Sequence, residues 1–460
     1  MTAAVPHHDL LIIGTGSGNT ILGPEHDRLD VAIVERDQFG GTCLTRGCIP
    51  SKMYVYAADL AELARSGPRL GVETSANGAD WKAIRDRIFD RVDAISEAGE
   101  AYRESLDNVT VYRGDARMVG DRTIVVNDER VSADQVVLAA GARPYIPDIP
   151  GLDSVPYHTS DTIMRIDELP EHLLVIGAGY IAAELAHVFG SLGSHVTILA
   201  RGDTMLRAED DDIRVRFTET YRRRFDVLCS TQVLAARDVS GPGGNRIELD
   251  VSVDGERRTV QGDMLLVATG RVPNGDELEV AAGGVELDVH GFVVTDEFLR
   301  TTAAGVWALG DICNPAMLKH AANADARVVA HNIVHPDDLR AVDRRFIPHA
   351  VFGFPQVASV GPTERELRRS GTPIRVSVRP YSETAYGWAM EDTDGLCKVI
   401  AHAETRQLLA AHIVGAQASI LLQQLVQGMR FGLTVDQMAR EQYYIHPALS
   451  EVVEQALLGL

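Results

Sequence analysis

Two glycine-rich turns constrain the fold of this chain more than any other sequence feature. The first, Gly14-Thr-Gly16-Ser-Gly18-Asn19, follows one apolar run and precedes another, Val31 to Glu35. Such runs are typical of buried parallel strands, and a helix is expected to open at the turn. Gly14 permits the turn, and Gly16 lets backbone N–H groups approach a pyrophosphate at the helix N-terminus. Glu35, 21 residues after Gly14, can accept hydrogen bonds from ribose hydroxyls, so this stretch predicts a dinucleotide-binding unit.

The second turn, Gly177-x-Gly179-x-x-Ala182, repeats the pattern 163 residues further along. Its following strand ends at Ala200-Arg201 without a carboxylate, and Arg207 comes shortly afterwards. Guanidinium groups can hold a 2′-phosphate, so Arg201 and Arg207 favour NADPH over NADH. The alternative is that both arginines only keep a loop soluble.

The wide spacing of the two turns predicts two domains rather than a short repeat. The fold class is therefore α/β, with two Rossmann-like dinucleotide-binding domains and a C-terminal α/β domain. Similar strand ends at Gly141 and Gly270, with proline-rich joints near 144–150 and 348, suggest the boundaries. We predict a first domain in residues 1–150 that continues in 286–342, a second in 151–285, and a C-terminal domain in 343–460.

Charge and composition exclude several kinds of function. The formal net charge of −21 disfavours nucleic-acid binding. No stretch approaches the roughly 20 apolar residues of a membrane span, and the N-terminus does not resemble a secretory signal. Five scattered cysteines do not form a disulfide framework, so a reducing, cytoplasmic location is expected.

The segment Cys43-Leu-Thr-Arg-Gly47-Cys48-Ile-Pro50-Ser-Lys52 carries the most chemistry. It predicts a helix that begins near Cys48, where the positive end of the helix favours a thiolate. No second cysteine or histidine pair is suitably spaced for zinc, so we predict no metal site. The favoured interpretation is a redox-active dithiol/disulfide beside the first nucleotide site, and the alternative is two buried thiols.

Two further segments place polar groups where such chemistry could use them. Asp311 closes an apolar strand and can reach a second chain of hydroxyls, although it could simply end the strand at a turn. His446-Pro447-x3-Glu451 places an imidazole beside a carboxylate on a helix that Pro447 is expected to start. Thiolates released from a disulfide need protons, so His446 is a candidate acid/base. The alternative is that His446 has a purely structural role.

Together these residues resemble the flavoprotein pyridine-nucleotide disulfide oxidoreductases over nearly the whole chain. The most specific matches are Gly40-Gly-Thr-Cys43-x4-Cys48, Gly310-Asp311 and His446-Pro447-x3-Glu451. Within the family the chain is most similar to the subgroup that reduces mycothione, the disulfide of mycothiol. That similarity rests on Gly14 to Asn19, Ala385-Tyr386-Gly-Trp388 to Asp392, and Gln442 to Leu460. Thr45-Arg46 departs from the family pattern and is expected to place a charge near the cysteines.

The resemblance implies FAD at the first unit and NADPH at the second. Its motif positions assign FAD contacts to Gly14, Gly16, Glu35, Thr42, Lys52, Ala116 and Asp311. Lys52 and Glu184 match an ion pair beside the flavin, and Tyr180 matches an aromatic gate over the nicotinamide pocket. The remaining nicotinamide-site positions are Gly177, Gly179, Gly270, Arg201 and Arg207. The resemblance further implies a homodimer in which His446 and Glu451 serve the Cys43–Cys48 disulfide of the partner subunit.

The predicted activity is NADPH-dependent reduction of a small-molecule disulfide, mycothione, through FAD and the Cys43–Cys48 pair. Dihydrolipoamide dehydrogenase and glutathione reductase are the alternatives within the family; Arg201 argues against the first, which normally has an acidic residue at this strand end. Mercuric and high-molecular-weight thioredoxin reductases need a C-terminal cysteine or selenocysteine pair, whereas the last cysteine here is Cys397. A non-catalytic flavin-binding subunit is the alternative from a different class. Tyr386 and Trp388 could line a substrate pocket or belong to the core.

Overall fold

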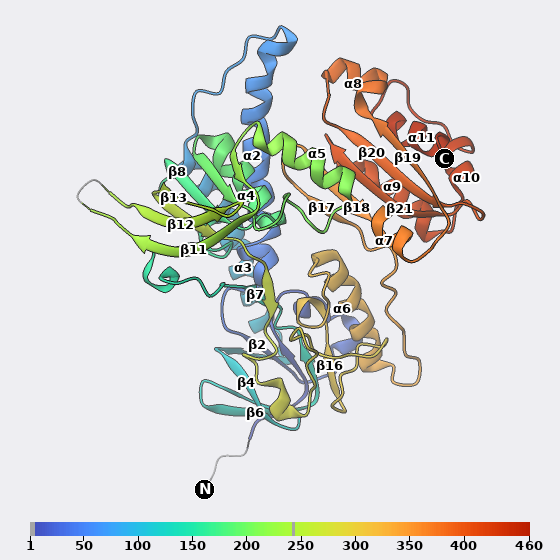
Figure 1. The fold of residues 1–460 in the computed structure, drawn as a ribbon. Helices are drawn as coiled ribbons and strands as arrows, with labels where there is room; N and C mark the ends of the chain where they lie inside the picture. Colours follow the sequence, from blue (N-terminus) through green and yellow to red (C-terminus); the bar gives the residue numbers. More distant parts are fainter. Residues whose placement is uncertain (1–4, 242–243) are drawn as a thin grey trace.

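A computed structural model describes residues 5–241 and 244–460 of the chain. The ribbon in Figure 1 has three parts: a lower one around β6 (Glu129–Leu138) and α6 (Lys319–Val334), an upper one around β8 (His172–Ile176) and α4 (Tyr180–Leu192), and a third formed by the C-terminal residues. The mixture of parallel sheets and covering helices confirms the predicted α/β fold class.

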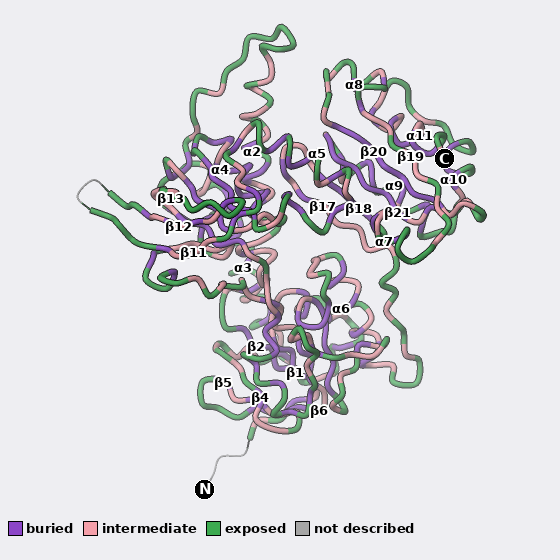
Figure 2. The backbone as a smooth tube through the Cα atoms, viewed as in Figure 1, coloured by how far each residue is buried: buried purple, intermediate pink, exposed green. Residues whose placement is uncertain are grey.

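The lower part contains a seven-stranded sheet. Strands β3, β2, β1, β6 and β16 are mutually parallel along the sheet, and the antiparallel β5 and β4 extend it beyond β6. Along β1, Leu11 and Ile13 face one core cluster, whereas Leu10 and Ile12 face another, so both sheet faces are buried. Figure 2 shows this burial along the central strands. The strands are His7–Ile13 (β1), Val31–Glu35 (β2), Val109–Arg113 (β3), Ala116–Gly120 (β4), Thr123–Val126 (β5), Glu129–Leu138 (β6) and Val306–Ala308 (β16).

The prediction of a helix directly after the first glycine turn is wrong. The crossover from β1 to β2 contains only two short 3₁₀ turns, Gly18–Thr20 and Pro24–His26. Gly18 and Gly23 weaken any helix here, and Pro24 lacks the N–H group that helix continuation requires. Helices α1 (Gly41–Thr45) and α6 (Lys319–Val334) lie in this part instead. Helices α2 (Cys48–Ser66) and α3 (Trp81–Glu104) extend into the upper part, where residues of both share a core cluster with α4.

The upper part repeats the strand–turn–helix–strand pattern as predicted. A four-stranded parallel sheet has the order β10-β9-β8-β14, and a separate antiparallel sheet has the order β11-β12-β13. The alanine- and leucine-rich helix α4 (Tyr180–Leu192) begins directly at the second glycine turn. The remaining elements are His172–Ile176 (β8), His195–Leu199 (β9), Asp211–Arg222 (α5), Asp226–Leu228 (β10), Thr231–Asp238 (β11), Ile247–Val253 (β12), Glu256–Gly262 (β13) and Met264–Val267 (β14). An antiparallel pair, Ala142–Pro144 (β7) and Arg271–Pro273 (β15), lies where the chain passes between the two parts.

The C-terminal part is a five-stranded antiparallel sheet of order β17-β18-β21-β20-β19. Leu425 and Val453, from helices α9 and α11, share its core cluster. The elements are His349–Val351 (β17), Gln356–Val360 (β18), Glu364–Arg369 (α7), Ile374–Pro380 (β19), Ala385–Met390 (α8), Leu396–His402 (β20), Leu408–Gly415 (β21), Ala418–Arg430 (α9), Val435–Arg440 (α10) and Ser450–Leu458 (α11). Glu451 lies on α11 as expected, but the helix begins at Ser450 rather than at Pro447. Within the described residues, no helix combines the length and apolar character of a membrane span.

Candidate active site

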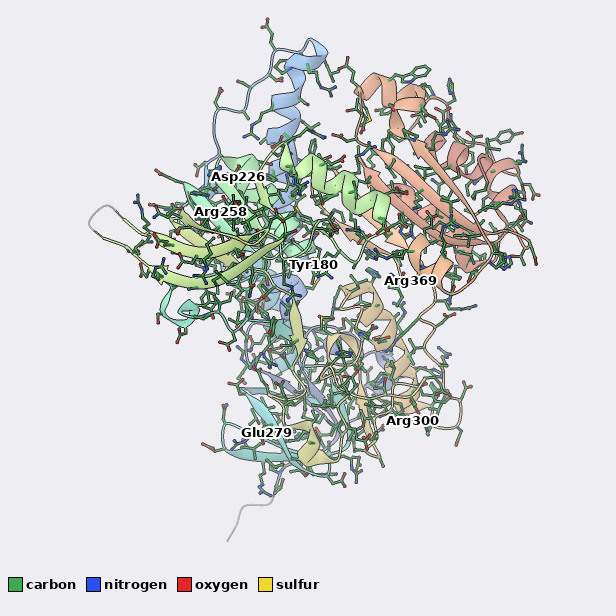
Figure 3. All side chains as sticks on the ribbon, viewed as in Figure 1. Tyr180, Asp226, Arg258, Glu279, Arg300 and Arg369 are labelled. Atoms are coloured by element: carbon green, nitrogen blue, oxygen red, sulfur yellow. The ribbon has the colours of Figure 1, made fainter. Side chains whose placement is uncertain are left out.

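A cavity of about 1510 Å³ lies among the three parts and gathers most of the predicted site residues. Its volume exceeds the few hundred to one thousand Å³ typical of small-ligand pockets, as an extended dinucleotide requires. Tyr180 lies near the meeting point of the three parts (Figure 3). The predicted residues that line this cavity are Gly14, Gly16, Glu35, Thr42, Cys43, Cys48, Lys52, Ala116, Tyr180, Glu184 and Asp311.

Both cysteines of the predicted pair line the cavity, and both are free thiols in this structure. Cys43 lies on the short helix α1, and Cys48 is the first residue of α2, as predicted. Gly47 permits the tight connection, because a Cβ there would lie 2.7 Å from the Thr42 carbonyl oxygen. The hydrogen bond from Cys43, assisted by the Lys52 ammonium, lowers the pKa of Cys48 to about 7 despite burial. The same hydrogen bond raises the pKa of Cys43, so Cys48 carries the thiolate.

The first glycine turn approaches neighbouring backbone so closely that side chains are excluded. Gly14 has φ +102°, and a Cβ there would lie 2.5 Å from the Ala139 carbonyl oxygen. A Cβ on Gly41 would lie 2.7 Å from the Gly16 Cα, so this turn and the cysteine-bearing loop touch through backbone. At Gly16 itself, an added Cβ would meet only Gly41, and that open side is available to a ligand.

Glu35 also stabilises the first turn, through a residue that the sequence analysis did not single out. One Glu35 carboxylate oxygen accepts hydrogen bonds from the Thr15 backbone N–H (2.9 Å) and from the Thr15 hydroxyl (2.6 Å). The other oxygen accepts from the Asp37 backbone N–H at 2.9 Å. Thr15 could have been noticed as the only hydroxyl residue between the first two glycines of the motif.

Arg46 lines the same cavity as both cysteines, and its charge has a carboxylate partner. Its guanidinium is ion-paired with Asp37, which lies two residues after the end of β2. The charge therefore lies toward the ribose end predicted for the first unit.

The second glycine turn repeats the geometry of the first. Gly177 has φ +123°, and a Cβ there would lie 2.2 Å from the Ala268 carbonyl oxygen, whereas Gly179 faces open space. The Leu206 N–H donates to the Ala178 carbonyl at 2.8 Å and so anchors the Arg207 loop to this turn. Arg201 and Arg207 are exposed, and the Arg207 side chain passes over Gly202. Gly270 has φ +119° and leaves its side open.

His446 and Glu451 form the predicted pair but lie outside the lining of the cysteine cavity. His446 Nδ1 is 2.7 Å from a Glu451 carboxylate oxygen, and the imidazole is 73% exposed. Tyr443 and Ile445 beside it are also highly exposed. Tyr386 and Trp388, on α8, are likewise exposed and do not line the cavity. Within one chain they therefore neither line a substrate pocket nor belong to the core.

These features fit FAD in the first unit. Gly16 leaves backbone open to a pyrophosphate, Glu35 lines the wall near the ribose end, and Asp311 lies at the end of β16. Burial raises the pKa of Asp311, and such a carboxyl group favours a hydrogen-bonding partner. In the described residues, no cluster of three or more potential metal ligands is found.

Known proteins resemble the chain along nearly its full length. Residues 8–326 match the pyridine nucleotide-disulphide oxidoreductase family, and residues 347–457 match the dimerisation domain of that family. Mycothione reductase from Mycobacterium tuberculosis is 46% identical over 98% of this chain and 99% of its own length. Mercuric reductase from Staphylococcus aureus is 31% identical over 94% of this chain and 78% of its own length.

The fold agrees with this relationship. A solved structure of the HOCl-induced flavoprotein disulfide reductase RclA from Escherichia coli superposes with a TM-score of 0.86. It is 27% identical and covers 98% of this chain and 99% of that one. Sequence and fold together make the protein an oxidoreductase that uses FAD and a nicotinamide dinucleotide. The chain belongs to the pyridine nucleotide-disulphide oxidoreductase family.

Proposed function

We propose that this enzyme uses NADPH to reduce mycothione to mycothiol. The observation that carries the proposal is that the Cys43–Cys48 dithiol lines the same cavity as residues from both dinucleotide-binding units. The choice of substrate is supported by the 46% identity to a mycothione reductase. The choice of NADPH is supported by Arg201 and Arg207, which lie exposed beyond the second glycine turn where a carboxylate would favour NADH.

The two cysteines have different roles. Bound FAD supplies the two electrons, taken from NADPH, that reduce the Cys43–Cys48 disulfide to the dithiol. Cys43 then attacks one sulfur of the substrate, which forms a mixed disulfide and releases the first thiol. The Cys48 thiolate attacks Cys43, which releases the second product as a thiolate and restores the Cys43–Cys48 disulfide. Cys48 suits this second step because its pKa lies near 7.

We further propose that the acid/base comes from a second copy of the chain. Cys43 must lose its proton before it attacks, and the first released thiolate must gain one. His446, oriented by Glu451, is exposed and lies outside its own chain's cysteine cavity. The match of residues 347–457 to a dimerisation domain supports a homodimer in which the partner's His446 reaches Cys43.

We also propose how the chain divides into domains with separate roles. Residues 1–150 and 286–342 would bind FAD, 151–285 would bind NADPH, and 343–460 would form the dimer interface. A cytoplasmic location accords with Cys229, Cys313 and Cys397, which are buried free thiols.

Substrate comparison tests the proposal directly. NADPH oxidation by the purified enzyme is measured with mycothione, glutathione disulfide and lipoamide at matched concentrations. The expected result is a kcat/KM for mycothione at least about tenfold above those for the other two, a difference of about 1.4 kcal/mol in transition-state binding. An equal or higher value for glutathione disulfide or lipoamide contradicts the substrate assignment but leaves the family intact.

A further inference from the structure

The first glycine turn lacks the helix that usually provides positive charge for a pyrophosphate. A helix N-terminus carries about half a positive charge and presents free N–H groups to an anion. Here the turn leads only into the three-residue 3₁₀ segment Gly18–Thr20, and the next segment ends at His26. The second turn, by contrast, opens the 13-residue helix α4. FAD would bring two phosphate charges to a turn that opens no α-helix of its own; the helix that begins beside it is α6, with Lys319 as its first residue.

Helix α6 packs against the crossover that replaces the missing helix. The Lys319 ammonium donates to the Ser17 hydroxyl at 2.9 Å, and that hydroxyl donates to the Asn323 side-chain oxygen at 3.1 Å. Further along, a His26 ring nitrogen lies 3.0 Å from the Ala330 carbonyl oxygen. Lys319, Ser17 and Asn323 all line the large cavity. A lysine 302 residues further along the chain is thus hydrogen-bonded to the first glycine turn.

Lys319 also differs from the other lysines and arginines of the cavity in having no carboxylate partner. Among the described residues, Lys319 forms no ion pair within 4.0 Å, whereas each of the others has at least one. Those compensated pairs are Arg36–Glu277, Arg46–Asp37, Lys52–Glu184, Arg143–Asp276 and Arg271–Asp161. An ammonium group without a counterion in a partly closed cavity is suited to a phosphate.

We propose that Lys319 binds the pyrophosphate of FAD and supplies the positive charge that the missing helix would otherwise provide. Ser17 positions the ammonium over the turn. The proposal is independent of which disulfide is the substrate.

Flavin affinity tests this proposal without reference to activity. FAD is removed from the purified enzyme, and rebinding is followed by flavin fluorescence. Lys319→Met should raise the FAD dissociation constant about 10- to 100-fold, as the loss of one charge-assisted hydrogen bond predicts. The FAD dissociation constant of Lys319→Arg should stay within about threefold of that of the natural protein, because the charge is kept. Lys82→Met, at an exposed position on α3, is the matched control and should leave the constant unchanged.

Competition by ADP identifies the part of FAD that Lys319 contacts. ADP carries the diphosphate without the flavin, so its affinity in Lys319→Met should fall by a factor similar to that for FAD. Unchanged FAD binding in Lys319→Met overturns the proposal. Weakened FAD binding with unchanged ADP binding also overturns it, because the ammonium would then act on the flavin ring. If Lys319→Met does not fold, Lys319→Arg and Lys319→Gln are compared with each other, and equal FAD affinities contradict the proposal.

Ser17→Ala provides a second test. It should weaken FAD binding less than Lys319→Met. The effect of the double variant should be smaller than the sum of the two single effects, because Ser17 acts through Lys319. Strict additivity would contradict the positioning role of Ser17.

Discussion

The Lys52 ammonium lies 2.5 Å from the Glu184 carboxylate, so an ion pair joins helices that begin in two different dinucleotide-binding units. Lys52 follows Cys48, the first residue of α2, by one turn, and Glu184 follows Tyr180, the first residue of α4, by one turn. Residues four apart share a helix face. The ion pair therefore holds Cys48 and Tyr180 at the same cavity from opposite units.

The hydrogen bond from Cys43 is the main cause that lowers the pKa of Cys48, and the two charges of this ion pair adjust that pKa further. The Lys52 charge lowers the pKa of Cys48 and the Glu184 charge raises it. Lys52→Met should therefore move the pKa of Cys48 above its value of about 7, and Glu184→Gln should move it lower. The pH dependence of Cys48 alkylation by iodoacetamide in the reduced enzyme, quantified by peptide mass spectrometry, measures both shifts. Shifts in the same direction for both variants would contradict the electrostatic explanation.

The cysteine pair should be required for turnover but not for flavin binding. Cys43→Ser and Cys48→Ser should each lower disulfide-dependent NADPH oxidation by at least about 10³-fold, because serine cannot form the disulfide. Both variants should keep the flavin absorbance of the natural protein. Cys229→Ser, which changes a buried thiol outside the cavity, is the control. Substantial turnover by Cys43→Ser would remove the dithiol from the reaction.

Arg201 and Arg207 should determine the choice of nicotinamide dinucleotide. Each guanidinium contact with the 2′-phosphate is worth about 1.5–3 kcal/mol, so Arg201→Ala and Arg207→Ala should each raise the KM for NADPH about 10- to 100-fold. The KM for NADH should hardly change, since NADH lacks that phosphate. Arg258→Ala, at an exposed position on β13, is the matched control. If the substitutions raise the KM for NADPH and the KM for NADH by the same factor, the two arginines have a structural role instead.

Hybrid dimers test whether the active site is shared between subunits. Cys43→Ser and His446→Gln should each be inactive as homodimers. When equal amounts are unfolded and refolded together, half of the dimers are hybrids, and each hybrid contains one intact Cys43–His446 pair only if that pair spans the interface. The mixture should then regain about a quarter of the natural activity. No recovery, with hybrid formation verified by differently tagged chains, would place the cysteine pair and His446 in the same subunit.

A buried ionic cluster should stabilise the contact between the upper and C-terminal parts. Lys398 Nζ lies 2.6–2.7 Å from carboxylate oxygens of Asp210, Asp212 and Glu364, and the Lys398 and Asp210 side chains are at most 2% exposed. Lys398→Met leaves Asp210 buried without its partner and should lower the free energy of unfolding by about 3–5 kcal/mol. The Arg406–Asp436 pair, whose side chains are 27% and 50% exposed, is the control, and Arg406→Met should cost at most about 1 kcal/mol.

The same cluster predicts a pH dependence. Burial alone would raise the pKa of Asp210, but the hydrogen bond from Lys398 lowers it on balance. The stabilisation is therefore present above the ordinary aspartate pKa of about 3.9 and is lost as the pH falls through the lower pKa of the folded state. Urea unfolding at several pH values measures the free energy of unfolding of the natural protein and of Lys398→Met. The difference between these two free energies should become smaller below about pH 4. A difference that widens on acidification would contradict the ion-pair explanation.

Local patterns were sufficient where a backbone position permits few residue types. Gly14 and Gly177 are each needed because a carbonyl oxygen lies where a Cβ would be, and the apolar runs before them are buried strands. The start of α2 at Cys48 was likewise predictable. Helix formation after Gly14 was not, because the glycine motif is compatible with either a helix or a broken crossover, and Gly23-Pro24 decided the outcome.

The sequence by itself determined the two dinucleotide-binding units, the adjacent placement of Cys43 and Cys48, and the family, since these depend on short motifs whose residues act on their own neighbours. Only the tertiary structure decided which distant groups share the cavity. It brings Lys319 onto Ser17 and leaves His446 outside the lining of its own chain's cysteine cavity. These relationships depend on the packing of helices and sheets over separations of up to several hundred residues, and no local spacing encodes such distances.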